Sequence, residues 1–404
     1  MDAGRTWRIV AIAGVVAGLG RAAAAQSLEP QSREAVVEEA QAARIANLHP
    51  YAPAKGERLM DKAEKLLNGT TPSWHPFFES AYRGGGFALG AGYLQHVSSF
   101  NFVDVRGSYS VSNYKRAEAE FVAPRLFHRR GELSVLGGWR DAPETHFYGV
   151  GTDTTLEDRA FFGFRESHGS ALLTLRPARR LLMVRGGFEV ARWSLDGGTG
   201  STPSVDNVFT PVTLPGLGTT TTYLHTRATA GFDWRPSAGY ARRGGFYGVT
   251  AHDYHDRDNQ LGFRQVDYEV IQHVPILREA WTLSLRGIAR TTALKDGQQV
   301  PFFMTPSLGG GDDLRGFSSW RFRDRNSLLV QGEWRIMVNR YLDTAVFFDA
   351  GKVTAHTSDL GFHDMKSDYG FGARFHTPIA TPLRIEYARS NEGGRLIVAV
   401  SPVF

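Results

Sequence analysis

Apolar and polar residues alternate along most of this chain after residue 74, and this alternation limits the possible folds more than any other feature. In the segment 328–338, Val330 and Trp334 share one face while Glu333 lies on the other. Successive side chains of a β-strand point to opposite faces, so this pattern predicts a strand. The segment 342–351 alternates in the same way, and the short connection between the two predicts a hairpin.

The same pattern predicts sixteen strands, at approximately 75–82, 86–96, 100–111, 114–124, 132–141, 162–176, 179–195, 220–235, 244–255, 262–274, 281–292, 327–338, 341–351, 367–376, 382–390 and 394–404. In water, an apolar sheet face needs a second layer to cover it, and no helical pattern follows residue 73. A sandwich of two sheets stays open as an alternative. The segment lengths, however, favour strands that cross a lipid bilayer. We therefore expect an all-β fold, a transmembrane antiparallel β-barrel of about 16 strands.

The lengths of the predicted connections support a membrane barrel. The long connections, 142–161, 196–219, 293–326 and 352–366, all follow odd-numbered strands, whereas those after even-numbered strands are short. Outer-membrane barrels have long loops outside the cell and short turns in the periplasm. This parity places both ends of the barrel, 75–404, on the periplasmic side.

The chain begins with a stretch typical of export. Arg5 and Arg8 precede an apolar run at 9–19, and small residues follow up to Ala25. This order predicts a secretory signal peptide over 1–25 that is removed after about Ala25. The run is shorter than the roughly 20 residues that a transmembrane helix needs.

Residues 26–74 differ from the rest, because 34–47 and 57–67 have helical patterns. We expect a short helical N-terminal segment. Two interpretations stay open: a periplasmic linker, or a plug whose amphipathic helix occupies the barrel lumen.

Several classes of function lack support in the sequence. The chain has no cysteine, so disulfides and thiolate sites are excluded, and its nearly balanced charge gives no reason to expect nucleic acid as a partner. The cluster from His252 to Asp258 could hold a metal, but we interpret it as part of a solvated loop. No nucleophile motif is present. We therefore expect no metal, no cofactor and no enzymatic activity.

Several motifs occur in a specific order. Gly309, Gly310 and Gly311 precede Leu314-Arg315-Gly316-Phe317, and Phe347-Phe348-Asp349-Ala350-Gly351 follows two strands later. Phe147-Tyr148-Gly149-Val150-Gly151, Gly332-Glu333-Trp334-Arg335 and a terminal Phe404 complete the set. Over 75–404 the chain resembles the bacterial surface antigen superfamily, the outer-membrane assembly and translocation barrels named after the eighty-five-kilodalton outer-membrane protein. This group includes the Bam and Tam barrels and the two-partner secretion transporters.

The resemblance implies that the loop 293–326 folds back into the lumen and sets Arg315 against the barrel wall. Glu333 and Asp349 fall on the inward faces of adjacent predicted strands, so either carboxylate could accept the guanidinium. The site residues expected are the loop residues Gly309, Gly310, Leu314, Arg315, Gly316 and Phe317, and the wall residues Glu333, Phe347, Asp349 and Gly351. Arg315 could pin the loop, take part in substrate handling, or do both.

The first and last predicted strands form a second candidate site, because a weakly paired seam could open and template a client strand. Pro76 and the glycines 84–86 weaken the first segment. In the last segment, Leu396, Val398, Val400 and Phe404 are expected to face lipid.

These features together predict a bacterial outer-membrane barrel that assists insertion, assembly or translocation of polypeptide or lipid-linked clients. Its partners would be outer-membrane lipid and a polypeptide client or a dedicated partner protein. The alternative is a passive or partner-gated channel or surface scaffold. Related assembly barrels carry polypeptide-transport-associated domains, and residues 26–73 are too short for one, so the chain departs from the family there.

Overall fold

The computed structural model describes residues 33–46, 73–177, 181–198, 203–277 and 279–404. Helix α1 (Arg33–Ala46) coincides to within one residue with the segment 34–47 that was predicted to be helical. The predicted signal peptide and the second predicted helix, 57–67, lie outside the described residues. Within the described ranges, no helix is both long and apolar enough to cross a membrane.

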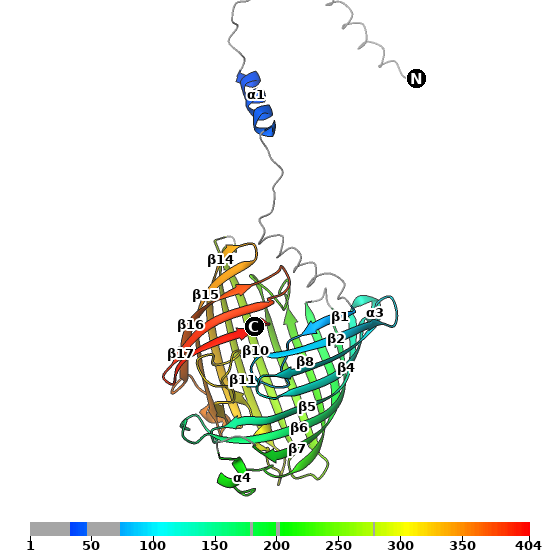
Figure 1. Cartoon of the computed structure of the whole chain (residues 1–404), viewed down its shortest axis with the longest axis vertical. Coiled ribbons are helices and arrows are strands. Elements are labelled where there is room, and N and C mark those ends of the chain that lie inside the picture. Colours follow the sequence, from blue (N-terminus) through cyan, green and yellow to red (C-terminus); the bar gives the residue numbers. More distant parts are fainter. Residues whose placement is uncertain (1–32, 47–72, 178–180, 199–202, 278) are drawn as a thin grey trace, which may run out of the picture. The chain divides into compact units, whose positions relative to one another are not determined.

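The described residues from Trp74 onward form a sixteen-stranded antiparallel β-barrel sheet in which each main strand pairs with the next along the chain (Figure 1). Its strands are β1 (Trp74–Phe77), β2 (Ala88–His96), β3 (Phe102–Ser110), β4 (Lys115–Arg125), β5 (Gly131–Phe147), β6 (Ala160–Leu175), β7 (Leu182–Gly197), β8 (Thr220–Asp233), β9 (Gly244–Asp256), β10 (Phe263–Ile276), β11 (Trp281–Leu294), β14 (Asn326–Asn339), β15 (Leu342–Thr354), β16 (Lys366–Phe375), β17 (Leu383–Ser390) and β18 (Gly393–Ala399). The predicted fold class and strand number are confirmed.

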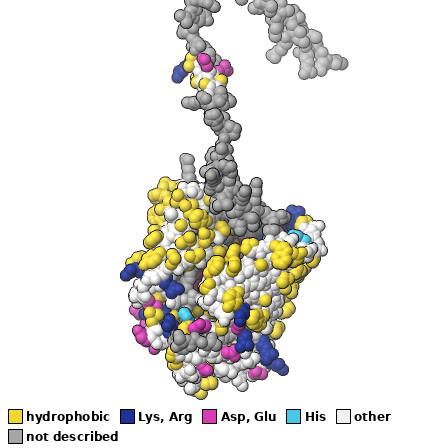
Figure 2. All heavy atoms as spheres, viewed as in Figure 1, with side chains coloured by type: hydrophobic (Ala, Val, Ile, Leu, Met, Phe, Trp, Pro, Cys, Tyr) yellow, Lys and Arg dark blue, Asp and Glu magenta, His cyan; other side chains and the backbone are white. Residues whose placement is uncertain are grey.

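Alternation along the strands separates an apolar outer face from a polar lumen. Val346 and Phe348 of β15 are 56% and 54% exposed on the outside, whereas Asp349 is fully buried inside. Figure 2 shows hydrophobic side chains gathered over the outer surface of the sheet. The outer face thus offers apolar surface to lipid, and charged residues that would be costly in a membrane face the lumen.

Several strand boundaries differ from the prediction, and three of these differences affect the interpretation. Strand β1 has four residues rather than eight, because the chain leaves the sheet after Phe77 and places Tyr82 and Arg83 in contact with inward side chains. Strand β5 runs on to Phe147. Strand β9 runs to Asp256, so His252 is not in a solvated loop; its Nδ1 lies 2.9 Å from Nε2 of His225 on β8.

The C-terminus also departs from the prediction. Strand β18 ends at Ala399, and Phe404 is buried rather than exposed to lipid. Its ring packs beneath the guanidinium groups of Arg286 and Arg335, whose Cζ atoms lie 6.0 and 5.6 Å from the ring centroid. Arg286 also donates to the carbonyl of Val403 at 3.2 Å. The last residues therefore turn into the lumen, where cation–π contacts hold the terminal ring.

The long connections add small elements at the opposite end of the barrel from the short turns. They contain α4 (Val205–Val208), the 3₁₀ turns η1 (Phe302–Met304) and η2 (Thr357–Asp359), and a two-stranded sheet of β12 (Ser307–Leu308) and β13 (Phe322–Arg323). An aromatic cluster joins the ends of β5 and β6 to these connections, with Phe147, Phe162 and Phe302 at its centre.

Candidate functional site

The connection between β11 and β14, residues 295–325, is called the motif loop below. Gly309 and Gly310 both have φ of +109°, a conformation that residues with a Cβ rarely adopt. A Cβ on Gly309 would also collide with the carbonyl oxygen of Ser318. The two glycines therefore permit the turn from which β12 and β13 pair.

Apolar side chains hold the tip of the motif loop against the barrel wall. Leu314 and Phe317 are almost completely buried, and the ring of Phe317 meets that of Phe322 edge to face at 5.2 Å between centroids. The cluster around them is completed by inward residues of β11, β14 and β15, namely Ile288, Leu329 and Val353. Burial of this surface stabilises the loop inside the lumen.

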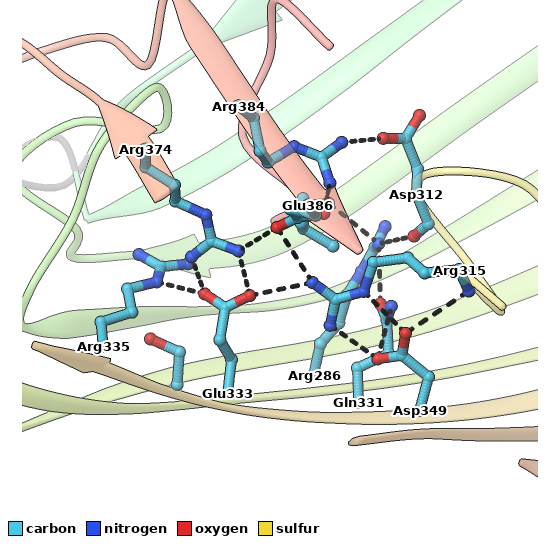
Figure 3. A network of polar contacts seen from close by, with 12 residues as sticks. Arg286, Asp312, Arg315, Gln331, Glu333, Arg335, Asp349, Arg374, Arg384 and Glu386 are labelled. Atoms are coloured by element: carbon cyan, nitrogen blue, oxygen red, sulfur yellow. Dashed lines mark hydrogen bonds and ion pairs between the residues drawn. The ribbon is translucent and has the colours of Figure 1, made fainter. Parts of the chain in front are cut away.

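Arg315 lies at the centre of the site and is fully buried. Its Nε and Nη2 donate to the two carboxylate oxygens of Asp349 at 2.7 and 2.8 Å. Its Nη1 reaches Glu333 at 3.1 Å and Glu386 at 3.3 Å (Figure 3). The sequence offered Glu333 or Asp349 as the partner, and the structure pairs Arg315 with both.

The wall beneath Arg315 is shaped to receive a planar cation. The Phe347 ring centroid lies 3.4 Å from Cζ of Arg315, so the guanidinium stacks on the ring while its edge binds Asp349. A Cβ on Gly351 would come within 2.8 Å of the Leu308 side chain. Gly351 therefore leaves room for the β12 end of the motif loop.

Further arginines extend the contact with Arg315 into a network. Glu333 binds Arg335 and Arg374, and Glu386 accepts from Arg374 at 2.7 Å and from Arg384 at 2.6 Å. Arg384 also donates to Asp312 at 2.8 Å. Four arginines thus meet four carboxylates, which balances charge inside a lumen where an unpaired ion would be costly.

The electrostatics of the network keep Arg315 charged. Burial alone would lower the pKa of Arg315, but the adjacent Asp349, and then Glu333 and Glu386, raise that pKa above its usual value. The guanidinium therefore binds as a permanent cation, and the loop is held by ion pairs rather than by a titrating group.

Asp313 of the motif loop is a buried acid rather than a surface one. It is 1% exposed and binds Arg83, which lies in the segment between β1 and β2. The Trp320 ring nitrogen donates to the Arg83 carbonyl at 2.9 Å. No local pattern links these positions, because they are more than 200 residues apart.

Asp368 of β16 was not selected from the sequence. It is 1% exposed, stands directly opposite Asp349 in the strand register, and has no hydrogen-bond partner for either carboxylate oxygen among the described residues. A Cβ on Gly316 would lie 2.5 Å from the Asp368 Cβ, so the motif glycine allows the loop to approach this strand. The alternation of the predicted strand 367–376 places Asp368 on the inward face, and this pattern could have identified it as a candidate.

The predicted seam residues do not join this network. Leu396, Val398 and Val400 are exposed on the outer face near the end of the sheet, as expected, whereas Phe404 lies inside the lumen. In the part of the chain that the structure describes, no cluster of three or more His, Cys, Asp or Glu side chains is placed to hold a metal ion.

Comparisons with known proteins agree with this geometry. A family model described as the Omp85 superfamily domain matches residues 101–395. A crystal structure of BamA from Haemophilus ducreyi lacking POTRA domains 1–3 is similar with a TM-score of 0.59 and 14% identity, covering 81% of this chain and 68% of that one. CdiB from Escherichia coli is similar with a TM-score of 0.52 and 11% identity, covering 81% of this chain and 59% of that one. No curated protein matches.

Proposed function

This chain belongs to the Omp85 superfamily, and from that premise we propose that it assists the insertion, assembly or translocation of a polypeptide or lipid-linked client. The resemblance seen in the ordered motifs is thereby confirmed. The family and the two similar structures support a bacterial outer-membrane barrel of the translocation or assembly class. Export through a signal peptide over 1–25, cleaved after about Ala25, belongs to the same proposal.

The observation that carries the proposal is the fully buried Arg315, which holds the motif loop inside the lumen. A client that passes along the lumen must displace this loop. Ion pairs and hydrogen bonds suit such a gate, because each group can exchange its partner for water when the lumen opens. The activity needs no catalytic residue, since the barrel would act by moving the loop, by opening the seam between β1 and β18, or by both.

A disulfide lock on the motif loop tests the proposal. A Cβ on Gly311 would lie 3.1 Å from Cγ2 of Ile397 on β18, so Gly311→Cys with Ile397→Cys places two sulfurs within bonding reach. The absence of native cysteine prevents other pairings. We expect the oxidised double variant to lose client assembly or secretion and a reductant to restore it.

A second cysteine pair in another part of the lumen wall is the matched control. Thr229 and Thr250 are direct partners on β8 and β9, with their hydroxyl oxygens 3.0 Å apart. Thr229→Cys with Thr250→Cys should form a disulfide without loss of activity. Full activity of the oxidised Gly311–Ile397 lock would refute gating by the motif loop.

In-cell photocrosslinking from Val400 identifies the client. Val400 is 44% exposed at the end of the sheet, so a probe there reaches molecules outside the barrel. Capture of several unrelated barrel proteins would support an insertase, and capture of one partner would support a dedicated secretion or assembly complex. A wild-type protein that captures nothing and conducts ions steadily in a planar bilayer would instead be a passive channel.

A further inference from the structure

A basic pocket lies at the end of the barrel that carries the short turns. It is formed by the β4–β5 turn, which contains α3 (Leu126–Arg129), and by the adjoining ends of β6 and β7. Its volume is about 390 Å³. Five arginines line it: Arg125, Arg129, Arg130, Arg176 and Arg185.

The positive charge of this pocket is largely uncompensated. Within the described ranges, Arg176 is the one arginine of the five that forms an ion pair, at 3.9 Å from Asp233. Glu132 is the one acidic residue among those that line the pocket. Arg185 donates from Nε to the Thr174 hydroxyl at 3.1 Å, so its remaining donors are available. The Arg315 network differs, because there every arginine faces a carboxylate.

The backbone of the turn is fixed in an unusual conformation. Phe127, His128 and Arg129 have φ values of 49°, 58° and 67°, three successive non-glycine residues in the left-handed region. Such residues are held against an intrinsic preference and concentrate at functional positions. The Arg176 amide donates to the Arg130 carbonyl at 2.7 Å, which ties the turn to β6 and brings arginines from the two connections together.

Exposed aromatic rings place the pocket at the level of lipid headgroups. Phe127 is 62% exposed, and Phe100, 47% exposed, stacks on Arg125 with 3.7 Å between Cζ and the ring centroid. Aromatic girdles of membrane barrels lie at the boundary between hydrocarbon and water. Guanidinium groups at that level match the oxygen geometry of phosphate.

We propose that this pocket binds the phosphate group of a phospholipid headgroup from the leaflet at this end of the barrel. Arg129 and Arg130 would bind the phosphate at the rim, and Arg185 would bind it from the lumen side. The same chemistry could accept soluble inorganic phosphate, and the experiment separates the two sources. The pocket shares no residue with the Arg315 network, and the inference does not rest on the proposed gate.

Lipid binding to the purified full-length protein in detergent tests the inference. Native mass spectrometry would count bound phosphatidylglycerol, with diacylglycerol as the ligand that lacks phosphate and inorganic phosphate as the competitor. An arginine near a membrane surface contributes roughly fivefold to binding of an anionic lipid. Replacing Arg129, Arg130 and Arg185 together with Gln should therefore weaken phosphatidylglycerol binding about a hundredfold.

Arg243→Gln is the matched control, because its side chain is 67% exposed in the β8–β9 connection, at the same end of the barrel and outside the pocket. The Arg243→Gln variant should bind as much phosphatidylglycerol as the wild type does. If the triple variant fails to fold, the single variant Arg129→Gln can replace it, because Arg129 is an exposed turn residue. This variant should bind phosphatidylglycerol about fivefold more weakly than the wild type.

Each outcome decides the inference. If the wild type binds phosphatidylglycerol and the arginine variants do not, the ligand is a lipid phosphate. If the wild type binds inorganic phosphate but no phosphatidylglycerol, the ligand is the soluble source of the same chemistry. Equal binding by wild type and variants, equal retention of diacylglycerol, or binding of an acidic peptide in place of phosphate would overturn it.

Discussion

Replacing Arg315 with Ala removes the central cation of the lumen network. Glu333 keeps Arg335 and Arg374, and Glu386 keeps Arg374 and Arg384, so both glutamates stay paired. Asp349 loses its bidentate partner and keeps Gln331, whose amide donates at 3.2 Å. The cost therefore falls on one buried carboxylate. Breaking a buried pair in this way destabilises a protein by about 3–5 kcal/mol, and we expect a loss in that range.

The effect can be measured on two levels. Urea unfolding in lipid vesicles, followed by heat-modifiable electrophoretic mobility, gives the free energy of unfolding. Trypsin cleavage of the motif loop and conductance in planar bilayers report whether the loop has left the lumen, and both should rise. Arg290→Ala is the control, because Arg290 is a partly exposed arginine elsewhere in the lumen, 3.5 Å from Asp267. Its loss should cost at most about 1 kcal/mol.

A double-mutant cycle isolates the interaction with Asp349. Asp349→Asn alone should destabilise the barrel, and the double variant should lose less than the sum of the single variants, with a coupling of about 1–3 kcal/mol. Additive losses, or an Arg315→Ala variant with unchanged stability, protease resistance and conductance, would falsify the pinning role.

Three further changes test the packing around this site. Phe404→Ala should lower the unfolding free energy by about 3 kcal/mol because the ring is buried. Val400→Ala on the lipid face should lower it by less than about 1 kcal/mol, and urea titration of both variants measures the difference. Gly316→Val should expose the motif loop to trypsin, since even the first added carbon meets Asp368, and an unchanged digest would contradict the close approach. Asp368→Asn should leave the melting temperature equal or higher, because it removes a like charge opposite Asp349, and a marked drop would show that the acid has a partner.

Local periodicity predicted the strands and their inward faces, including those that carry Glu333 and Asp349. The position of Arg315 against these carboxylates was implied by the family resemblance, and the structure shows the contact with both. The pairing of Arg83 with Asp313 could not be predicted, because it joins two segments that are not strands and that carry no common pattern.

The inward turn of Phe404 was missed because alternation does not show where a strand loses its partner. Strand β17 begins at Leu383, after Pro382, and its register with β18 ends with Arg384 opposite Ala399. Beyond that point Leu383 is the last remaining residue of β17, and Pro402 has no amide hydrogen to donate to a ladder. The apolar residues that follow are then buried most readily inside the lumen.

The motif loop contacts both ends of the sheet, so the two routes of opening are not independent. On one side, Arg83, in the segment that follows β1, binds Asp313 of the loop. On the other, the Ser390 hydroxyl at the end of β17 donates to the Gly316 carbonyl at 2.9 Å, and Arg395 of β18 donates to the Ser318 hydroxyl at 3.0 Å. Separation of the first and last strands must break or stretch one of these sets, and withdrawal of the loop removes both. A client that opens the seam therefore also weakens the hold on the loop, and a client that displaces the loop frees the ends of the sheet.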